Sequence, residues 1–293
     1  MSGSTSDRER AGDDTLTGSA ATTPPTLRAA VREYFAMLAS ELRSHAPNGN
    51  RTRWRTAPDS TERQRHYGHI SAILLGHGLP ALRHHHPRAG APAGARHAVA
   101  DYLRNHPEIL RLMEDNVFRP EPEWDFKGTT LLGSLVEPPS GDAHGLDGTD
   151  GTATPLSGTD FLVGEQRNRS LAHAGERFVF GFESQRLQAL GLHKYAAALE
   201  HSARELGDHA GYDIQSWQAD GSELLIRVKT TRFGPQTPFY LSEHELAVAR
   251  AHGNRYAIYR VFDFGPQPRL FVVSGGIEHR CQLRPSVHRA VLR

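Results

Sequence analysis

Two short stretches of the sequence carry the residue types that cleave phosphodiester bonds. Residues 211–214 (Gly-Tyr-Asp-Ile) hold an aspartate, and residues 226–231 (Ile-Arg-Val-Lys-Thr-Thr) hold a lysine. A divalent metal held by carboxylates activates water and neutralises the leaving group, and a neighbouring lysine can stabilise the charged transition state. Asp213, as a metal ligand, and Lys229 fit these two roles. Mg²⁺ needs a second carboxylate beside the aspartate, but the position two residues before the lysine is Arg227, which cannot bind a cation.

A β-hairpin is the element that brings these residues together. The Gly-containing break between the two stretches is typical of a hairpin loop. In the second strand, alternation of side chains puts Arg227 and Lys229 on the face opposite the apolar residues. If Trp217 pairs with Glu223, Asp213 lies opposite Arg227. A slip of one or two residues would change that pairing.

The arginine leaves several interpretations open. In the first, the chain is a metal-dependent endonuclease that is active with Mg²⁺. In the second, the Arg227 guanidinium occupies the metal position and forms a bidentate salt bridge with Asp213. The cleft would then bind phosphate through Arg227, Lys229 and Arg232, and the domain would bind nucleic acid or a partner protein without cutting. In a third interpretation, the chain is a pure scaffold.

The bulk composition limits the class of protein. A net charge of +1 over 293 residues gives no global attraction to nucleic acid, so any basic surface must be local. A single cysteine, Cys281, fits a reducing, cytoplasmic compartment. No stretch approaches the roughly 20 apolar residues of a membrane helix, so no membrane partner is expected. The chain has no Walker motif, so ATP-driven translocation would have to come from a partner protein.

Composition divides the chain into four parts. Residues 1–24 have almost nothing to bury and are expected to form a disordered tail. Residues 25–125 carry apolar residues at spacings of three and four, which predicts a helical domain. Residues 126–159 are rich in Gly, Pro, Asp, Ser and Thr and are expected to be a flexible linker. Residues 160–293 mix helix and strand patterns, which predicts an α/β domain.

The order of the expected elements defines the fold class. In the helical domain, helices are expected at about 27–44, 60–76 and 95–104, and from residue 107 through 113. In the C-terminal domain, we expect a helix at 172–190, strands at 211–217, 223–230, 255–262 and 269–274, and a helix at 242–251. This order predicts an α+β chain in which a mixed sheet lies at the centre of an α/β sandwich.

The C-terminal part resembles a known family. From about residue 168 to the end, the sequence is similar to the NO VEIN C-terminal domain family, which is assigned to the PD-(D/E)XK nuclease-like superfamily and is common in bacterial restriction and defence proteins. The stretches that carry the similarity are 175–179, 200–202, 207–208, 211–214, 228–231, 238–239, 245–246 and 259–262.

The resemblance implies a restriction-endonuclease-like fold and a site. It implies that Asp213 and Lys229 lie in the nuclease cleft, with Glu183 or Glu176 contributed from the first helix of the domain. It also implies a nucleic-acid substrate. Mg²⁺ is the expected cofactor if the site is active, and a helicase or a methyltransferase is a candidate partner. The usual family strand reads Ile-Glu-Val-Lys-Thr-Thr, and Arg227 stands in place of its glutamate.

Overall fold

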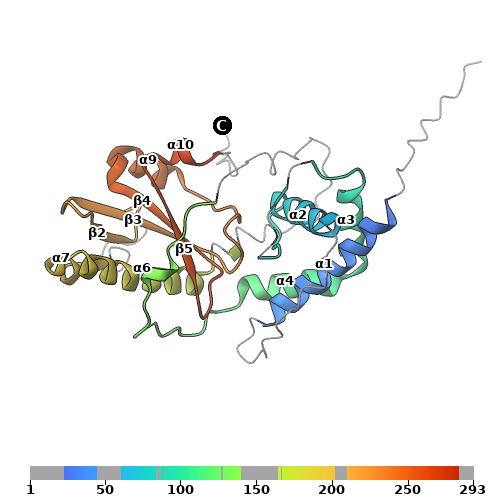
Figure 1. Ribbon diagram of the computed structural model, residues 1–293, viewed down its shortest axis with the longest axis horizontal. Helices are drawn as coiled ribbons and strands as arrows, with labels where there is room; N and C mark the ends of the chain where they lie inside the picture. The colour runs from blue at the N-terminus through green and yellow to red at the C-terminus, as the bar shows by residue number, and fades with distance from the viewer. Residues whose placement is uncertain are drawn as a thin grey trace, which may run out of the picture.

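The computed structural model describes residues 23–44, 61–139 and 164–283, apart from 84, 86, 89, 127, 166 and 202–209. These residues form a group of helices and a sheet flanked by helices (Figure 1). The helical group contains α1 (Pro25–Ser44), α2 (Thr61–Gly76), α3 (Ala95–Asn105) and α4 (Pro107–Phe118). The predicted α+β class is therefore confirmed. Among all the residues that the structure describes, no helix is long and apolar enough to cross a membrane.

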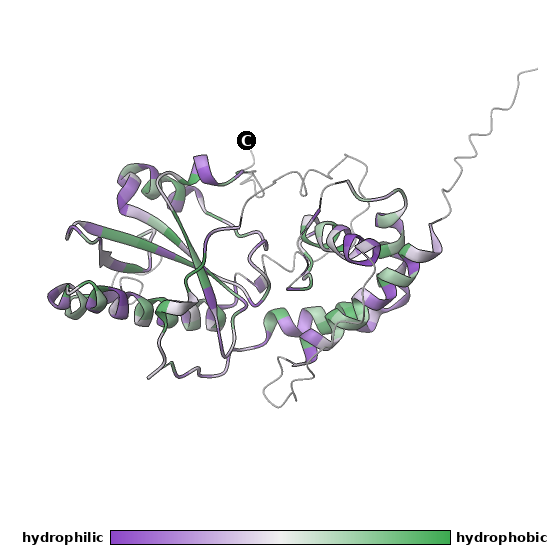
Figure 2. Ribbon diagram, in the orientation of Figure 1, coloured by the Kyte–Doolittle hydropathy of each residue, from purple (hydrophilic) through white to green (hydrophobic). Residues whose placement is uncertain are grey.

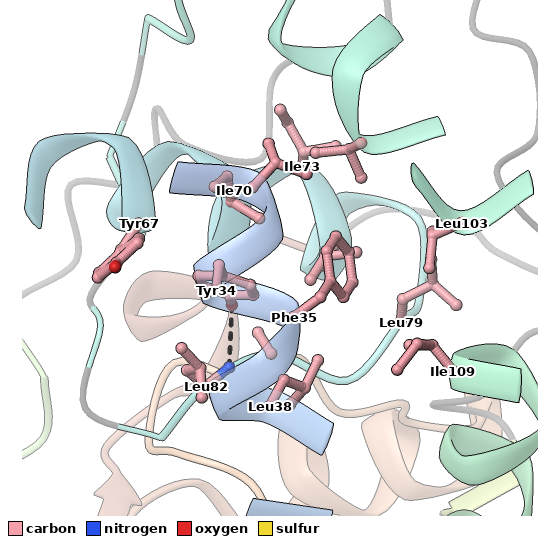
Figure 3. Packing of buried hydrophobic residues seen from close by; sticks show 14 of the residues in the cluster. Tyr34, Phe35, Leu38, Tyr67, Ile70, Ile73, Leu79, Leu82, Leu103 and Ile109 are labelled. Carbon is pink, nitrogen blue, oxygen red and sulfur yellow. Dashed lines mark hydrogen bonds between the residues drawn. The ribbon is translucent and has the colours of Figure 1, made fainter. Parts of the chain in front are cut away.

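The helical group has one apolar core (Figure 3). Tyr34 and Phe35 of α1 are fully buried in it. The Tyr34 hydroxyl accepts a hydrogen bond from the Leu82 amide at 2.9 Å and shares another with Ser71 at 2.7 Å, so its burial leaves no unpaired polar group. Phe35 stacks on Tyr102 of α3 with ring centroids 4.8 Å apart. The apolar spacing that predicted α1 is thus its buried face.

The sheet has five strands in the order β1-β2-β3-β4-β5. They are β1 (Glu200–His201), β2 (Ile214–Trp217), β3 (Glu223–Thr230), β4 (Tyr256–Phe262) and β5 (Arg269–Ser274). Neighbouring strands are antiparallel except β3 and β4, which are parallel. This confirms the predicted mixed sheet. The long helices α6 (Arg169–Ala189) and α9 (Glu243–His252) lie on opposite sides of it (Figure 1). Short helices complete this part: η1 (Leu132–Ser134), α7 (His193–Ala197), η4 (Gly253–Arg255) and α10 (Ile277–Arg280).

Alternation along β3 separates the two layers of side chains. Ile226 packs into the core on the α6 side, whereas Leu225 packs with Tyr256 on the α9 side. Hydrophobic residues follow the strands (Figure 2), as expected for a parallel pair that is covered on both faces. Arg227 and Lys229 share the face of Leu225 and therefore lie on the α9 side.

The β2–β3 hairpin has the predicted register, because Trp217 pairs with Glu223. The strand β2 begins later than expected. Gly211 has a φ of 74°, a left-handed conformation that interrupts the extended backbone. Asp213 precedes the strand, but its amide still donates to the Ile226 carbonyl at 2.8 Å. This hydrogen bond keeps Asp213 level with Arg227.

Part of the expected linker packs against the sheet. Leu131 is 4% exposed and belongs to the core on the α6 side. Leu135 forms an isolated parallel bridge with Leu270 of β5, whose carbonyl accepts from the Val136 amide at 2.9 Å. The Gly and Pro residues of this region thus surround a few apolar residues that do contribute to the core. Residues 140–163 of the expected linker, and residues 1–22 of the expected tail, lie outside the described residues.

The chain that follows β3 contacts the helical group. Phe233 is 3% exposed and belongs to the core formed by the helices. A Cβ added at Gly234 would lie 2.7 Å from the Arg83 carbonyl oxygen, so the two backbones approach closely there. Arg83 Nε also lies 3.7 Å from Asp263 Oδ1, just after β4. The sheet and the helices are therefore held together by direct packing.

Candidate functional site

Four charged side chains meet on the α9 side of the sheet. Arg227 Nη1 lies 2.7 Å from Asp213 Oδ1, and Arg227 Nε lies 2.5 Å from Glu245 Oε1. Lys229 Nζ donates to the same Glu245 oxygen at 2.7 Å. The guanidinium thus bridges two carboxylates and does not form the expected bidentate pair with Asp213 alone. We call these four residues, Asp213, Arg227, Lys229 and Glu245, the charged cluster.

A capping box at the start of α9 orients Glu245. Its amide donates to Ser242 Oγ at 3.1 Å, and its Oε2 accepts from the Ser242 amide at 2.7 Å. This reciprocal arrangement holds the carboxylate in place and leaves Oε1 for the two cations. Glu245 is the site residue that sequence reasoning missed. The Ser-x-x-Glu spacing marks a helix start, but it does not tell which side chains that helix end will meet.

A close approach of α9 encloses Asp213. A Cβ added at Gly211 would lie 2.7 Å from Val248 Cγ2 of α9, so only glycine permits this packing without a shift. Asp213 is 3% exposed. Its Oδ2 accepts from the Val228 amide at 2.7 Å while Oδ1 faces Arg227. Both oxygens are therefore paired, as a buried carboxylate requires.

Burial and mutual pairing set the ionisation of the charged cluster. Burial raises the pKa of Asp213, and Arg227 opposes this rise. Burial lowers the pKa of Lys229, and the Glu245 carboxylate opposes that change. For Glu245, burial acts upward, but Lys229 and Arg227 outweigh it and hold the pKa below its ordinary value. Burial acts downward on Arg227, but the two carboxylates raise its pKa. Two carboxylates and two cations give the ionised cluster no net charge.

Mg²⁺ does not fit this arrangement. The ion demands near-octahedral oxygen ligands, but Asp213 Oδ1 already binds the Arg227 guanidinium, and Glu245 Oε1 already binds this guanidinium and the Lys229 ammonium. A divalent cation at this point would be repelled by two fixed positive charges. Within the described ranges, no group of three or more His, Cys, Asp or Glu side chains is arranged to hold a metal ion.

Glu183, predicted as a catalytic residue, lies on the other face of the sheet. It is fully buried on α6 and pairs with Arg186 at 2.6 Å. Its carboxylate accepts hydrogen bonds from the Ser216 hydroxyl at 2.5 Å and from the Tyr259 hydroxyl at 2.9 Å. These contacts tie α6 to β2 and β4. The sheet separates Glu183 from the charged cluster, so the predicted catalytic role does not fit it.

Glu176, the other glutamate predicted from the first helix, lies two turns earlier on α6. It pairs with His173, with 3.6 Å between Oε2 and Nδ1. Its charge also helps to raise the pKa of Arg227, after the larger effects of Asp213, Glu245 and Tyr256. Glu176 is therefore an electrostatic neighbour of the charged cluster, whereas Glu245 is its direct member.

Arg232, predicted as a phosphate ligand, is 1% exposed and binds the end of α4. Its Nη1 donates to the Asn116 carbonyl at 2.7 Å and its Nη2 to the Arg119 carbonyl at 2.6 Å, while Nε pairs with Glu121. A cation is favourable at a helix C-terminus, where carbonyls lack helical partners. With its donors engaged in this way, Arg232 does not fit the predicted phosphate contact.

Glu245→Gln gives a pH-dependent test of the charged cluster. Glutamine can keep the capping box but not the charge that balances Lys229 and Arg227, so we expect a loss of about 3 kcal/mol near neutral pH. The Glu245 carboxyl titrates near 4.5 when unfolded and lower when folded. Its stabilisation is therefore complete above that pH and is lost as the pH falls through the folded-state pKa. Urea unfolding of both proteins should show the difference shrinking in acid, and a difference that is independent of pH would contradict the assignment.

The part of the chain that contains the charged cluster matches a known protein family. Residues 175–273 match the family described as Protein NO VEIN, C-terminal. The match runs from α6 into β5 and includes all four residues of the charged cluster, so the resemblance noted in the sequence is confirmed for this part. No curated protein and no solved structure matched the chain.

Proposed function

We propose that this part of the chain is a PD-(D/E)XK-like domain that binds nucleic acid without cutting it, because Arg227 has replaced the metal ion. The observation that supports the proposal is the position of the Arg227 guanidinium between the Asp213 and Glu245 carboxylates. A guanidinium supplies positive charge but carries no exchangeable water. It therefore cannot generate the metal-bound nucleophile that hydrolysis requires.

The hydrogen bonding of the carboxylates supports the loss of metal chemistry. Asp213 uses one oxygen for Arg227 and the other for the Val228 amide. Glu245 uses one oxygen for the two cations and the other for the Ser242 amide. A metal would have to displace a buried ion pair, and breaking such a pair costs about 3–5 kcal/mol.

The nucleic-acid part of the proposal rests on the family resemblance and on Arg227. The Arg227 side chain keeps 22% of its surface exposed, against 5–7% for the rest of the charged cluster. It is thus the member that a backbone phosphate can reach, through guanidinium donors that the carboxylates leave free. In this role the chain would position a helicase or a methyltransferase partner on its substrate in a restriction or defence system.

Metal binding and cleavage test the central claim. We expect no heat of Mn²⁺ binding in calorimetry and no Mg²⁺- or Mn²⁺-dependent nicking of plasmid DNA by the wild type. Arg227→Glu should gain Mn²⁺ affinity by at least about tenfold, because three carboxylates then face one point. Asp213→Asn in the same background should remove that gain. Arg255→Glu is the matched control. The Arg255 side chain is half exposed, its Nη1 lies 3.9 Å from Glu223 Oε2, and it does not contact the charged cluster.

Two outcomes would overturn parts of the proposal. Metal-dependent nicking by the wild type that disappears in Asp213→Ala would show an intact nuclease. Nucleic-acid binding should weaken as salt rises, because phosphate contacts release counterions, and Arg227→Gln should reduce both the affinity and the salt slope. Absence of any salt-dependent binding would instead favour a scaffold or a module that binds a partner protein.

A further inference from the structure

Arg260 of β4 is a buried cation that pairs with no carboxylate in the described part of the chain. The residue is 2% exposed. Its Nη2 donates to the Thr237 carbonyl at 3.1 Å, and its Nε has no hydrogen-bond partner. Burial lowers the pKa of Arg260 to about 10, and the Glu165 charge opposes that change. The Glu165 oxygens, however, accept their hydrogen bonds from Thr231 and from the Arg232 amide.

Arg232 shows how this protein satisfies a buried guanidinium for structural purposes. It is as deeply buried as Arg260, yet its donors bind the Glu121 carboxylate and the carbonyls of Asn116 and Arg119. An ion that loses its water without such compensation costs several kcal/mol. Arg260 has one carbonyl in place of this set, so its guanidinium retains most of its capacity to bind an anion.

The position of Arg260 favours a ligand. In the sheet it is the register partner of Lys229, which places it beside the charged cluster and on the same face. The strands β3 and β4 are parallel and joined by α9, and ligands of such units bind beyond the carboxyl ends of the strands. Phe239, which lies in the crossover between β3 and β4, covers Arg260: its ring centroid is 5.4 Å from the guanidinium carbon.

We propose that Arg260 anchors a binding site for a terminal phosphate group, which is reached when residues 234–241 move and lift Phe239 from the guanidinium. The planar fork of an arginine matches two phosphate oxygens. A terminal phosphate carries more charge than an internal phosphodiester and can enter an enclosed site at a strand end. This site is separate from Arg227 and does not depend on whether the charged cluster binds a metal.

Thermal unfolding of the full chain tests the proposal, with inorganic phosphate as the probe and sodium chloride of equal ionic strength as the reference. Phosphate should raise the Tm of the wild type, since a ligand of the folded state stabilises it. Arg260→Met should lose this shift while remaining at least as stable in phosphate-free buffer, because an apolar residue replaces a poorly paired charge. Phe239→Ala should bind at lower phosphate concentration. The control is Arg269→Met, which removes another arginine that lies over a ring, Phe262, but is exposed.

Oligonucleotides with and without a 5′-phosphate identify the source of the group. A larger shift with the phosphorylated strand places the end of a nucleic acid in the site, whereas a shift with inorganic phosphate alone indicates a free phosphate or a small phosphate ester. Both results support the site. Equal phosphate shifts in the wild type, Arg260→Met and Arg269→Met would overturn it.

Hydrogen exchange of the wild type gives a second measurement that needs no variant. Phosphate should slow the exchange of amides in residues 234–241, because the segment must close over the bound group. Unchanged exchange there at a phosphate concentration that raises the Tm would mean that phosphate binds elsewhere, and this result would also overturn the proposal.

Discussion

Gly175→Ala is expected to destabilise the protein by about 3 kcal/mol. A Cβ at this position of α6 would lie 1.9 Å from Thr230 Oγ1 and 2.9 Å from Thr230 Cβ. The second distance involves an atom that no rotamer change can move, so α6 would have to shift away from β3. That shift would loosen the core that both elements share. Urea unfolding measures the loss as a lower midpoint at an unchanged slope.

Gly181→Ala is the matched control on the same helix. Its Cβ would meet only Leu131 Cδ1, at 3.1 Å, the end of a flexible side chain. Alanine also favours a helix over glycine by up to about 1 kcal/mol, so this variant should be neutral or more stable. Adding Thr230→Ala to Gly175→Ala should restore part of the loss, because Cβ of residue 230 remains. Equal midpoints for the Gly175 and Gly181 variants would contradict the close approach.

Arg232→Met is expected to cost about 4 kcal/mol, because it leaves buried acceptors without donors. The acceptors are the carbonyls of Asn116, Val117 and Arg119 and the carboxylate of Glu121. All belong to the end of α4 or the residues just after it, so the change should also loosen the contact between the helices and the sheet. Chemical denaturation monitored by near-ultraviolet circular dichroism measures both effects.

Arg104→Met is the control for Arg232→Met. Arg104 pairs with Asp101 at 2.6 Å, but its side chain is 67% exposed, so its loss should cost less than about 1 kcal/mol. Arg232→Lys should fall between the two, because an ammonium keeps the charge but cannot reach all the acceptors of a planar fork. A cost below that of the Arg104 variant would contradict the role assigned to Arg232.

The hairpin could be predicted from the sequence because its information is local. Side-chain alternation and a short Gly-containing loop determine the β2–β3 register, and these place Asp213 beside Arg227. The family resemblance of residues 175–273 also rests on short local stretches of sequence. Arg232, expected as a phosphate ligand, lies beyond β3, which ends at Thr230, and strand alternation counted from Lys229 would already have put it on the face opposite the charged cluster.

The choice between glutamates could not be predicted in the same way. Glu183 and Glu245 both lie on helices that pack on the sheet, and the sequence periodicity of each helix is compatible with either face. The face depends on how the β3–β4 crossover places α9 and how α6 approaches from the other side. That arrangement is a property of the assembled sheet, so the sequence does not show that Glu245, rather than Glu183, contacts Arg227 and Lys229.

The insertion of Phe233 into the helical core has a consequence for modularity. A gene segment that encoded only the helices would lack this ring, and it would also lack Arg232, which caps α4. A segment that encoded only the sheet would expose both residues to water. Exchange of either half between proteins would therefore require compensating changes where Arg232 and Phe233 contact the helices, so we expect the two halves to be inherited together.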